Sequence, residues 1–367
     1  MTGLRILVQA LVLLALFSQL AAGERRTQHV ILVTIDGLRW QEVFHGAEDK
    51  LINKEAGGVG DPVRVRQRFG SGTDVERRSK LMPFFWKVIA EQGQVFGDPG
   101  QKCDVTVTNG LYFSYPGYNE ILCGRADKRI DSNAKRDNPN RTVLEWLHAK
   151  PAYQGRIAAF ASWDVFPFIL NQRRSGIYVN AGWQPLEHFR NAVDADTLNA
   201  LAAELPRYWD NVRYDLFTFR GALEYLHTRH PRVLYLALGE TDDWAHAGRY
   251  DLYLDAARRS DDYLKRLWRT AQQLPQYRDK TSLVITTDHG RGDTREGWKS
   301  HGVDYPGCDR IWMAVLGPDT PALGVRRNLK ATQSQTASTV ASLVGEDYWA
   351  IDRRIAAPLP GILKRAK

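Results

Sequence analysis

Continuous apolar runs alternate with helical segments along most of the chain. Five runs have the length of a strand and lack polar alternation, which predicts buried parallel strands covered on both faces. They are His29–Ile35, Arg156–Ala161, Val233–Leu238, Ser282–Thr286 and Ile311–Leu316. Segments with helical periodicity lie between them: Leu81–Gln92, Thr142–His148, Tyr214–Thr228 and Tyr250–Gln273. This alternation predicts an α/β fold with a doubly wound, mostly parallel sheet and helices on both faces.

Two segments interrupt the alternation. His45–Lys80 is charged and rich in glycine, which predicts a long loop. Trp163–Trp209 contains many aromatic residues without a clear period, and is either a small cap or a long surface connection. No Pro/Gly/Ser-rich linker divides the chain, so we expect one domain over residues 24–367, with insertions at about 45–80 and 163–209.

The N-terminal segment has the layout of a signal peptide. Met1–Arg5 carries a positive charge, Ile6–Leu20 is almost entirely apolar, and small residues precede the polar sequence that begins at Glu24. This pattern predicts a signal peptide over residues 1–23, cleaved before Gly23 or Glu24, and export to the periplasm or the medium. An uncleaved membrane anchor is the alternative, although the apolar run is short for a span. After cleavage we expect no stable membrane insertion, because no later run is long enough.

Composition excludes several classes of protein. Hydrophobic residues make up 43% and charged residues 25% of the chain, which is ordinary for a globular protein and excludes disordered or fibrous chains. The net charge is +8, but the basic residues are scattered among acidic ones, so we predict no nucleic-acid polymer as a partner. Export would permit disulfides among Cys103, Cys123 and Cys308; Cys103 could pair with Cys123, but the sequence does not choose a pairing.

Metal-ligand residues follow two of the predicted strands. Asp36 comes directly after His29–Ile35 and precedes a glycine. Asp242 and His246 follow Val233–Leu238 and are four residues apart, which places them on one face of a helical turn. Ligands of open α/β sheets collect at the carboxyl ends of the strands. Asp oxygen and His nitrogen are common zinc ligands. Glu240 and Asp243 compete for the same role.

A third strand is followed by the same chemistry. Asp288 and His289 come after Ser282–Thr286, and Gly290 permits a sharp turn that would bring both side chains to one ion. His301 follows between Ser300 and Gly302. Each pattern alone has an ordinary explanation as a turn or a surface pair. Together the six residues predict a binuclear site for two divalent metal ions, and zinc is expected because the ligands include no thiolate.

Ser114 is the candidate nucleophile. It precedes Pro116 and a short helical pattern that ends at Gly124, so it is placed at a helix N-terminus, where backbone N–H groups favour anions. A helix-capping role is the simpler interpretation, and both roles can hold together. A two-metal phosphoryl-transfer site needs an attacking oxygen between its ions.

With these motifs in this order, the chain resembles the alkaline phosphatase superfamily, most closely its type I phosphodiesterase/nucleotide pyrophosphatase-like branch. The resemblance implies a single catalytic domain of alkaline phosphatase-like fold. It implies one zinc held by Asp36, Asp288 and His289 beside Ser114, and another held by Asp242, His246 and His301. It also implies that Asn133 binds a phosphate oxygen.

The chain departs from the family pattern in two places. Diesterases of this branch usually carry Thr where this chain has Ser114, which weakens the assignment of the substrate. Sulfatases of the superfamily carry Arg two residues after the proline that corresponds to Pro116, and Tyr118 stands there instead. The second departure argues against a sulfatase with a formylglycine.

The resulting hypothesis is an exported, binuclear metal-dependent hydrolase of small-molecule phosphate esters that acts through a phosphoseryl intermediate. A sulfate-ester or phosphonate hydrolase on the same core is an alternative. A non-catalytic exported metal-binding protein is an alternative of another class. The sequence leaves monoester or diester preference and the oligomeric state open.

Overall fold

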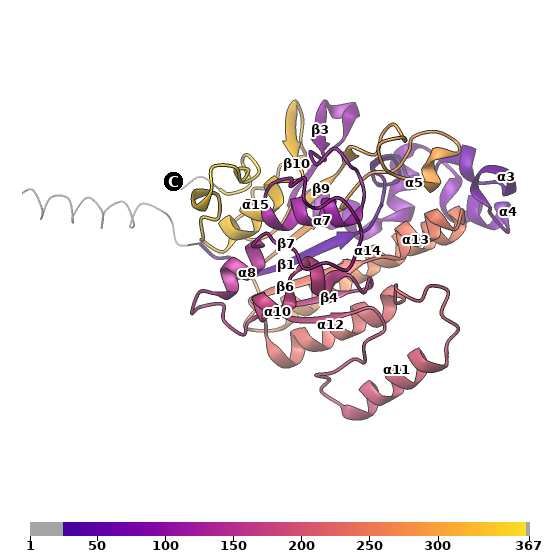
Figure 1. Cartoon of the computed structure of the whole chain (residues 1–367). Helices are drawn as coiled ribbons and strands as arrows, with labels where there is room; N and C mark the ends of the chain where they lie inside the picture. The colour runs from indigo at the N-terminus through magenta and orange to yellow at the C-terminus, as the bar shows by residue number, and fades with distance from the viewer. Residues whose placement is uncertain (1–24, 365–367) are drawn as a thin grey trace, which may run out of the picture.

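A central eight-stranded sheet organises the computed structural model, which describes residues 25–364 (Figure 1). The strand order is β10-β2-β9-β7-β1-β6-β4-β5, and a smaller sheet has the order β11-β3-β8. The strands of the large sheet are β1 (His29–Ile35), β2 (Gln94–Phe96), β4 (Ile157–Ala161), β5 (Tyr178–Ala181), β6 (Val233–Leu238), β7 (Thr281–Thr286), β9 (Met313–Leu316) and β10 (Gly324–Val325). Those of the small sheet are β3 (Cys103–Thr106), β8 (Arg310–Ile311) and β11 (Leu329–Thr332).

Helices lie on both sides of the large sheet, as predicted (Figure 1). They are α2 (Trp40–His45), α3 (Lys54–Gly57), α4 (Pro62–Val65), α5 (Asp74–Leu81), α6 (Ala90–Gln92), α7 (Ser114–Cys123), α8 (Val143–His148), α9 (Phe166–Ile169), α10 (Gln172–Ser175), α11 (Ala192–Glu204), α12 (Asp215–Arg229), α13 (Glu240–His246), α14 (Tyr250–Gln273) and α15 (Gln335–Leu343). None of the helices in the described part is long and apolar enough to span a bilayer. The predicted signal peptide, residues 1–23, lies outside the described residues.

Strand β1 shows why the apolar runs are continuous. All of its residues are buried, and it pairs in parallel with β6 on one side and β7 on the other. Ile31 and Val33 point into the core that α12 and α14 cover, whereas Val30 and Leu32 point into the core that α7, α8 and α15 cover. A strand with a core on each face has no solvated side, so alternation disappears.

Two predicted elements differ in detail. Ile311–Leu316 is divided at Trp312 into β8 and β9, and β9 runs antiparallel to β7, so its prediction as a parallel strand was wrong. Buried apolar character does not encode strand direction. Leu81–Gln92 is only partly α-helical: a π-helical turn over Phe85–Ile89 precedes α6.

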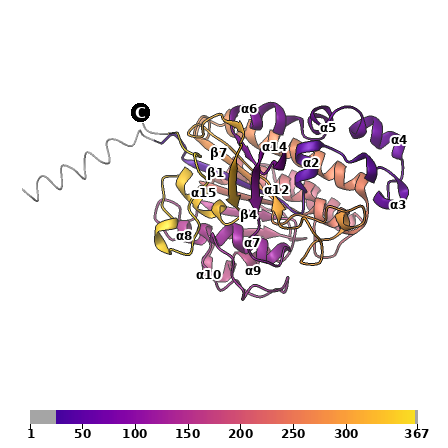
Figure 2. The ribbon, with the colours of Figure 1, turned by 90° about the horizontal axis from the view of Figure 1, so that it is seen from above.

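The prediction of a loop over His45–Lys80 was wrong. The segment contains α3, α4 and most of α5, which lie together at one end of the molecule (Figures 1 and 2). Helix α5 begins with a capping box, in which the side chains of Thr73 and Glu76 each accept a hydrogen bond from the other residue's backbone N–H. This Thr-x-x-Glu spacing is a helix-start signal that the glycine content obscured.

Trp163–Trp209 is neither a simple cap nor a simple surface connection. Its strand β5 extends the large sheet beside β4, and α9 and α10 precede that strand. Helix α11, which has no buried residue, stands away from the sheet (Figure 1). Cys103, Cys123 and Cys308 are all buried and free, so the disulfide that export would permit is not formed.

Candidate active site

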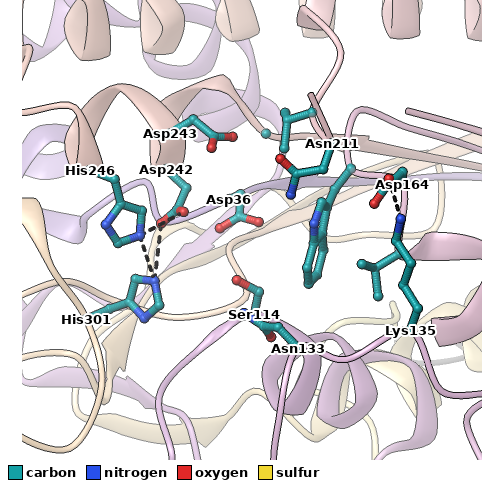
Figure 3. Close-up of a pocket in the computed structure, with 14 residues that line it drawn as sticks. Asp36, Ser114, Asn133, Lys135, Asp164, Asn211, Asp242, Asp243, His246 and His301 are labelled. Atoms are coloured by element: carbon teal, nitrogen blue, oxygen red, sulfur yellow. Dashed lines mark hydrogen bonds and ion pairs between the residues drawn. The ribbon is translucent and has the colours of Figure 1, made fainter. Parts of the chain in front are cut away.

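The predicted ligands meet at one edge of the sheet. Strands β1, β6 and β7 are parallel neighbours, so their carboxyl ends lie together. Asp36 follows β1, α13 with Asp242 and His246 follows β6, and Asp288 follows β7. The loop beyond Lys299 returns His301 to the same place, and a pocket opens there (Figure 3).

Asp36, Asp288 and His289 form the first cluster, which is entirely buried. The ring Nδ1–H of His289 donates to the carbonyl of Gly290 at 2.9 Å, so Nε2 is the nitrogen that would bind a metal once it has lost its proton. That Nε2 lies 3.4 Å from Asp36 Oδ1 and 3.3 Å from Asp288 Oδ2. Both oxygens are buried and have no hydrogen-bond partner. Buried, unpaired donors of this kind around one point fit a divalent cation.

The titration of this cluster indicates the same deficit of positive charge. Burial and the neighbouring Asp36 raise the pKa of Asp288 well above its ordinary value. Burial alone would lower the pKa of His289, but Asp288 and Asp36 outweigh it and raise that pKa to about 9. Without a cation, protons must offset the repulsion between the carboxylates.

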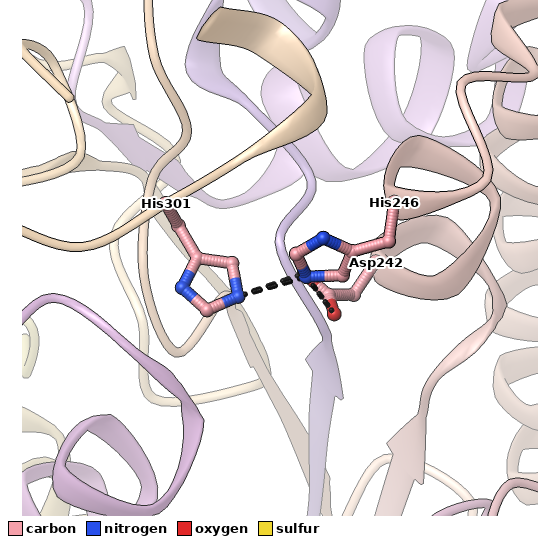
Figure 4. Close-up of side chains that lie close together, drawn as sticks. All are labelled: Asp242, His246 and His301. Carbon is pink, nitrogen blue, oxygen red and sulfur yellow. Dashed lines mark hydrogen bonds and ion pairs between the residues drawn. The ribbon is translucent and has the colours of Figure 1, made fainter.

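Asp242, His246 and His301 form the second cluster (Figure 4). His246 Nε2 lies 3.2 Å from Asp242 Oδ2 and 3.0 Å from His301 Nε2. Burial and the nearby His289 lower the pKa of His301 to about 2, so its ring is neutral. A carboxylate and two imidazole nitrogens facing one point also fit a divalent cation.

Ser114 lies beside the first cluster. It is the first residue of α7, it is buried, and its Oγ is 3.4 Å from His289 Nε2. The prediction that Ser114 caps the helix was wrong, because Phe113 occupies the N-cap position and no side chain caps this end. The same nitrogen faces Asp36 and Asp288, so the hydroxyl borders the point that these ligands surround. Asn133 lines the pocket next to Ser114, and its Oδ1 accepts a hydrogen bond from Tyr115 N at 2.9 Å (Figure 3). Its NH₂ group is left to contact a ligand.

Several residues that orient the ligands had no signal in the sequence. The hydroxyl of Tyr118 donates to Asp36 Oδ2 at 2.8 Å. Arg291 is buried and its guanidinium pairs with Asp242 Oδ1. Arg291 is the main favourable partner in holding the pKa of Asp242 well below its ordinary value, against the effect of burial. Only the position of Arg291 directly after Asp288-His289-Gly290 could have suggested this role.

The two competing acidic residues take other positions. The carboxylate of Glu240 accepts a hydrogen bond from the backbone of Asp215 at 2.8 Å and pairs with Arg259, so it belongs to neither cluster. Asp243 lines the pocket but is also outside both clusters. Burial and the charges of Asp242 and Asp36 raise the pKa of Asp243 to about 9.

The pocket extends beyond the ligand clusters. It has a volume of about 360 Å³, and its far end is lined by Lys135, Trp163, Asp164 and Asn211 (Figure 3). Sequence reasoning missed these residues. Trp163 and Asp164 follow shortly after β4, a predicted parallel strand, so the same rule that found Asp36 applied to them as well.

Solved structures share this fold at low sequence identity. Wild-type alkaline phosphatase PafA has a TM-score of 0.58 and 11% identity, with 93% of this chain and 100% of that chain covered. A sulfatase from Bacteroides thetaiotaomicron has a TM-score of 0.56 and 13% identity, with 94% and 78% covered. An alkaline phosphatase superfamily protein from Vibrio parahaemolyticus has a TM-score of 0.54 and 13% identity, with 94% and 71% covered. The fold is therefore alkaline phosphatase-like.

The sequence places the chain more narrowly. The family model for type I phosphodiesterase / nucleotide pyrophosphatase matches residues 88–340, which is more than half of the chain. The chain belongs to this family. Asp36 precedes the matched range, whereas the remaining predicted site residues lie within it. No curated protein matches the chain in sequence.

Proposed function

We propose that this protein is an exported hydrolase of small-molecule phosphate esters that uses two zinc ions and a phosphoseryl intermediate. The observation that carries the proposal is the position of Ser114. Its Oγ lies 3.4 Å from His289 Nε2, the atom on which the two unpaired carboxylate oxygens of the first cluster also converge. Asp36, Asp288 and His289 would hold one ion, and Asp242, His246 and His301 the other.

Divalent ions, when bound, lower the pKa of an adjacent hydroxyl and neutralise charge on a phosphoryl group. Ser114 Oγ loses its proton to solvent and attacks phosphorus, the P–O bond to the ester group breaks, and the departing alkoxide takes up a proton from water. Water then attacks the phosphoserine, which releases the phosphate and restores the hydroxyl. The N-terminus of α7 and the NH₂ group of Asn133 stabilise the non-bridging oxygens. Tyr118 and Arg291 hold Asp36 and Asp242 in place.

Tyr118 also supports phosphate rather than sulfate esters. It occupies the position where superfamily sulfatases carry arginine, and it is buried with its hydroxyl bonded to Asp36. At this position of α7 the chain therefore has a neutral tyrosine and not the arginine of the sulfatases.

Ser114→Ala tests the covalent mechanism. Ser114 makes no capping hydrogen bond at the start of α7, so removing its hydroxyl should leave the helix and the fold intact, and the variant retains all six proposed ligands. Turnover of 4-nitrophenyl phosphate and bis(4-nitrophenyl) phosphate, measured with saturating zinc, should fall by about 10³-fold or more. Acid quenching of the wild type with labelled substrate should trap a phosphoprotein.

Ser79→Ala is the matched control, because Ser79 lies on the remote helix α5 and its hydroxyl donates only to the backbone of its own helix. It should behave as the wild type does. Near-normal turnover by Ser114→Ala would contradict the covalent mechanism. Turnover of 4-nitrophenyl sulfate above that of both phosphate esters would contradict the proposed substrate class and identify the protein as a sulfate-ester hydrolase.

Export is part of the proposal and rests on the sequence of residues 1–23. N-terminal sequencing of the protein recovered from the periplasm or medium should begin at Gly23 or Glu24. A membrane-bound product that retains Met1 would instead establish an anchor.

A further inference from the structure

The wall of the pocket remote from the ligand clusters, formed by Lys135, Trp163, Asp164 and Asn211, is held in place by backbone contacts. An antiparallel bridge joins Trp163 to Val212, and Asp164 N donates to Asn211 O at 3.0 Å. The bridge fixes two segments that are distant in sequence, and both line the pocket. The indole of Trp163 packs against Tyr118 and Phe166, with ring centroids 6.5 Å apart in each case, so its position is set by the core.

The polar groups of this wall have unused hydrogen-bonding capacity. Asp164 Oδ2 accepts from Lys135 Nζ at 2.6 Å and can accept a second hydrogen bond, whereas Asp164 Oδ1 is buried without a partner. Lys135 has three donors and uses one. The side-chain amide of Asn211 makes no hydrogen bond to the rest of residues 25–364. The side chains of Lys135 and Asp164 are 52% and 28% exposed, so a ligand can reach them.

We infer that Lys135, Trp163, Asp164 and Asn211 form a subsite for the group esterified to the phosphoryl, and that this group is a sugar ring. The inference rests on the proposed function and names its substrate class. Ring hydroxyls would donate to Asp164 and accept from Lys135 and Asn211, while the C–H face of the ring packs on the indole. In Figure 3 the labelled Lys135, Asp164 and Asn211 lie across the pocket from Asp242, His246 and His301.

Other substituents fit this wall less well. An acyl chain or an aryl group would cover the indole but would form no hydrogen bond with the remaining donors of Lys135, the second lone pair of Asp164 Oδ2 or the amide of Asn211, and would displace the water that solvates them. A second phosphate would pair with Lys135 but would be repelled by Asp164. Lys135 is the one cation among the described residues that line the pocket, and Asp164 balances it. Both donors and acceptors are therefore needed, and a polyhydroxylated ring supplies them.

Two esters of matched size test the inference: glucose 6-phosphate and cyclohexylmethyl phosphate. Both are esters of a primary alcohol on a six-membered ring, and only one carries hydroxyls. If the enzyme prefers diesters, their 4-nitrophenyl diesters are used. We expect zinc-loaded wild type to show a kcat/KM about 10- to 100-fold higher for the sugar ester. Asp164→Ala and Lys135→Met should bring that ratio close to one, mainly through KM of the sugar ester.

Lys150→Met is the matched control, because Lys150 forms a similar pair with Glu346 at 2.8 Å outside the pocket. It should keep the wild-type ratio. A general loss of stability would lower kcat/KM for both esters by the same factor and leave their ratio unchanged. Equal kcat/KM for the two esters in the wild type, or an unchanged ratio in both subsite variants, would overturn the inference.

Calorimetry on zinc-loaded Ser114→Ala measures the same preference without turnover. Tighter binding of glucose 6-phosphate than of cyclohexylmethyl phosphate is expected, and equal affinity contradicts the subsite. A wild type that hydrolyses neither ester nor the 4-nitrophenyl compounds contradicts the proposed function instead, so the two failures are distinguishable.

Discussion

Repulsion among buried carboxylates dominates the site at the scale of single residues. Asp36, Asp242 and Asp288 all lie within 4 Å of His289 Nε2. The raised pKa values of Asp288 and His289 follow from this crowding. In the folded chain these carboxylates therefore repel one another until a cation binds between them. The residues that hold them are the buried Arg291 and Tyr118, not further acids or histidines.

Zinc binding should consequently release protons. The pKa of His289 is raised to about 9, so its ring is protonated at pH 7 in the metal-free protein, and Asp288 also binds a proton more readily than usual. Both must lose their protons to ligate. The apparent zinc affinity should therefore rise between pH 6 and pH 9. Calorimetry in buffers of different ionisation enthalpy should detect proton release at pH 7. Affinity that is independent of pH over this range would contradict the prediction.

At the scale of elements, the site depends on how closely α7 approaches the turn after β7. Gly117 lies in the interior of α7, where alanine would ordinarily be favoured by about 1 kcal/mol. An added Cβ would lie 2.2 Å from the carbonyl oxygen of Asp288. The absence of a side chain at Gly117 is what lets the helix carry Ser114 up to the ligands.

Gly117→Ala should therefore destabilise the protein, although alanine usually stabilises the interior of a helix relative to glycine. We expect it to lower the free energy of unfolding by about 1–3 kcal/mol through overpacking, and to reduce turnover of 4-nitrophenyl esters by displacing Ser114 or Asp288. Urea unfolding and steady-state kinetics measure the two effects. Gly60→Ala is the control, because the nearest atom to its Cβ, Asp251 Oδ2, is 3.7 Å away. A Gly117→Ala protein as stable and active as Gly60→Ala would show that the contact is unimportant.

At the scale of the whole molecule, the ligands tie distant segments together. Asp36 follows β1, Asp242 and His246 lie on α13, Asp288 follows β7, and His301 lies on a later loop. Ions held by these clusters would be present only in the folded chain, so binding stabilises the fold.

Removal of metal should lower Tm. At a free zinc concentration 100 times Kd, each site would contribute about 2.7 kcal/mol, which corresponds to a shift of several degrees in a protein of this size. Calorimetry with zinc, with a chelator, and after zinc is restored measures the effect. Asp242→Ala should retain a smaller shift, because the cluster of Asp36, Asp288 and His289 remains. Identical Tm values with zinc and with the chelator would contradict the binuclear proposal.

The sequence by itself determined the class of the fold and the candidate ligands. Buried parallel strands need continuous apolar runs, and the residues that follow them meet at one edge of the sheet, so the groups after β1, β6 and β7 were readable from order alone. The same reasoning would have extended to Trp163 and Asp164 after β4.

Only the tertiary structure decided which other residues contact these ligands. The hydrogen bond from Tyr118 and the pairing of Arg291 depend on contacts between segments far apart in the chain. The division of the six ligands into two clusters was implied by the family resemblance, and the structure has the same two clusters. Strand direction at β9 and the helices within residues 45–80 were also decided there. The local hydrophobic pattern of the sequence indicates burial and periodicity. The partner of a buried charge depends on which distant segments pack against it.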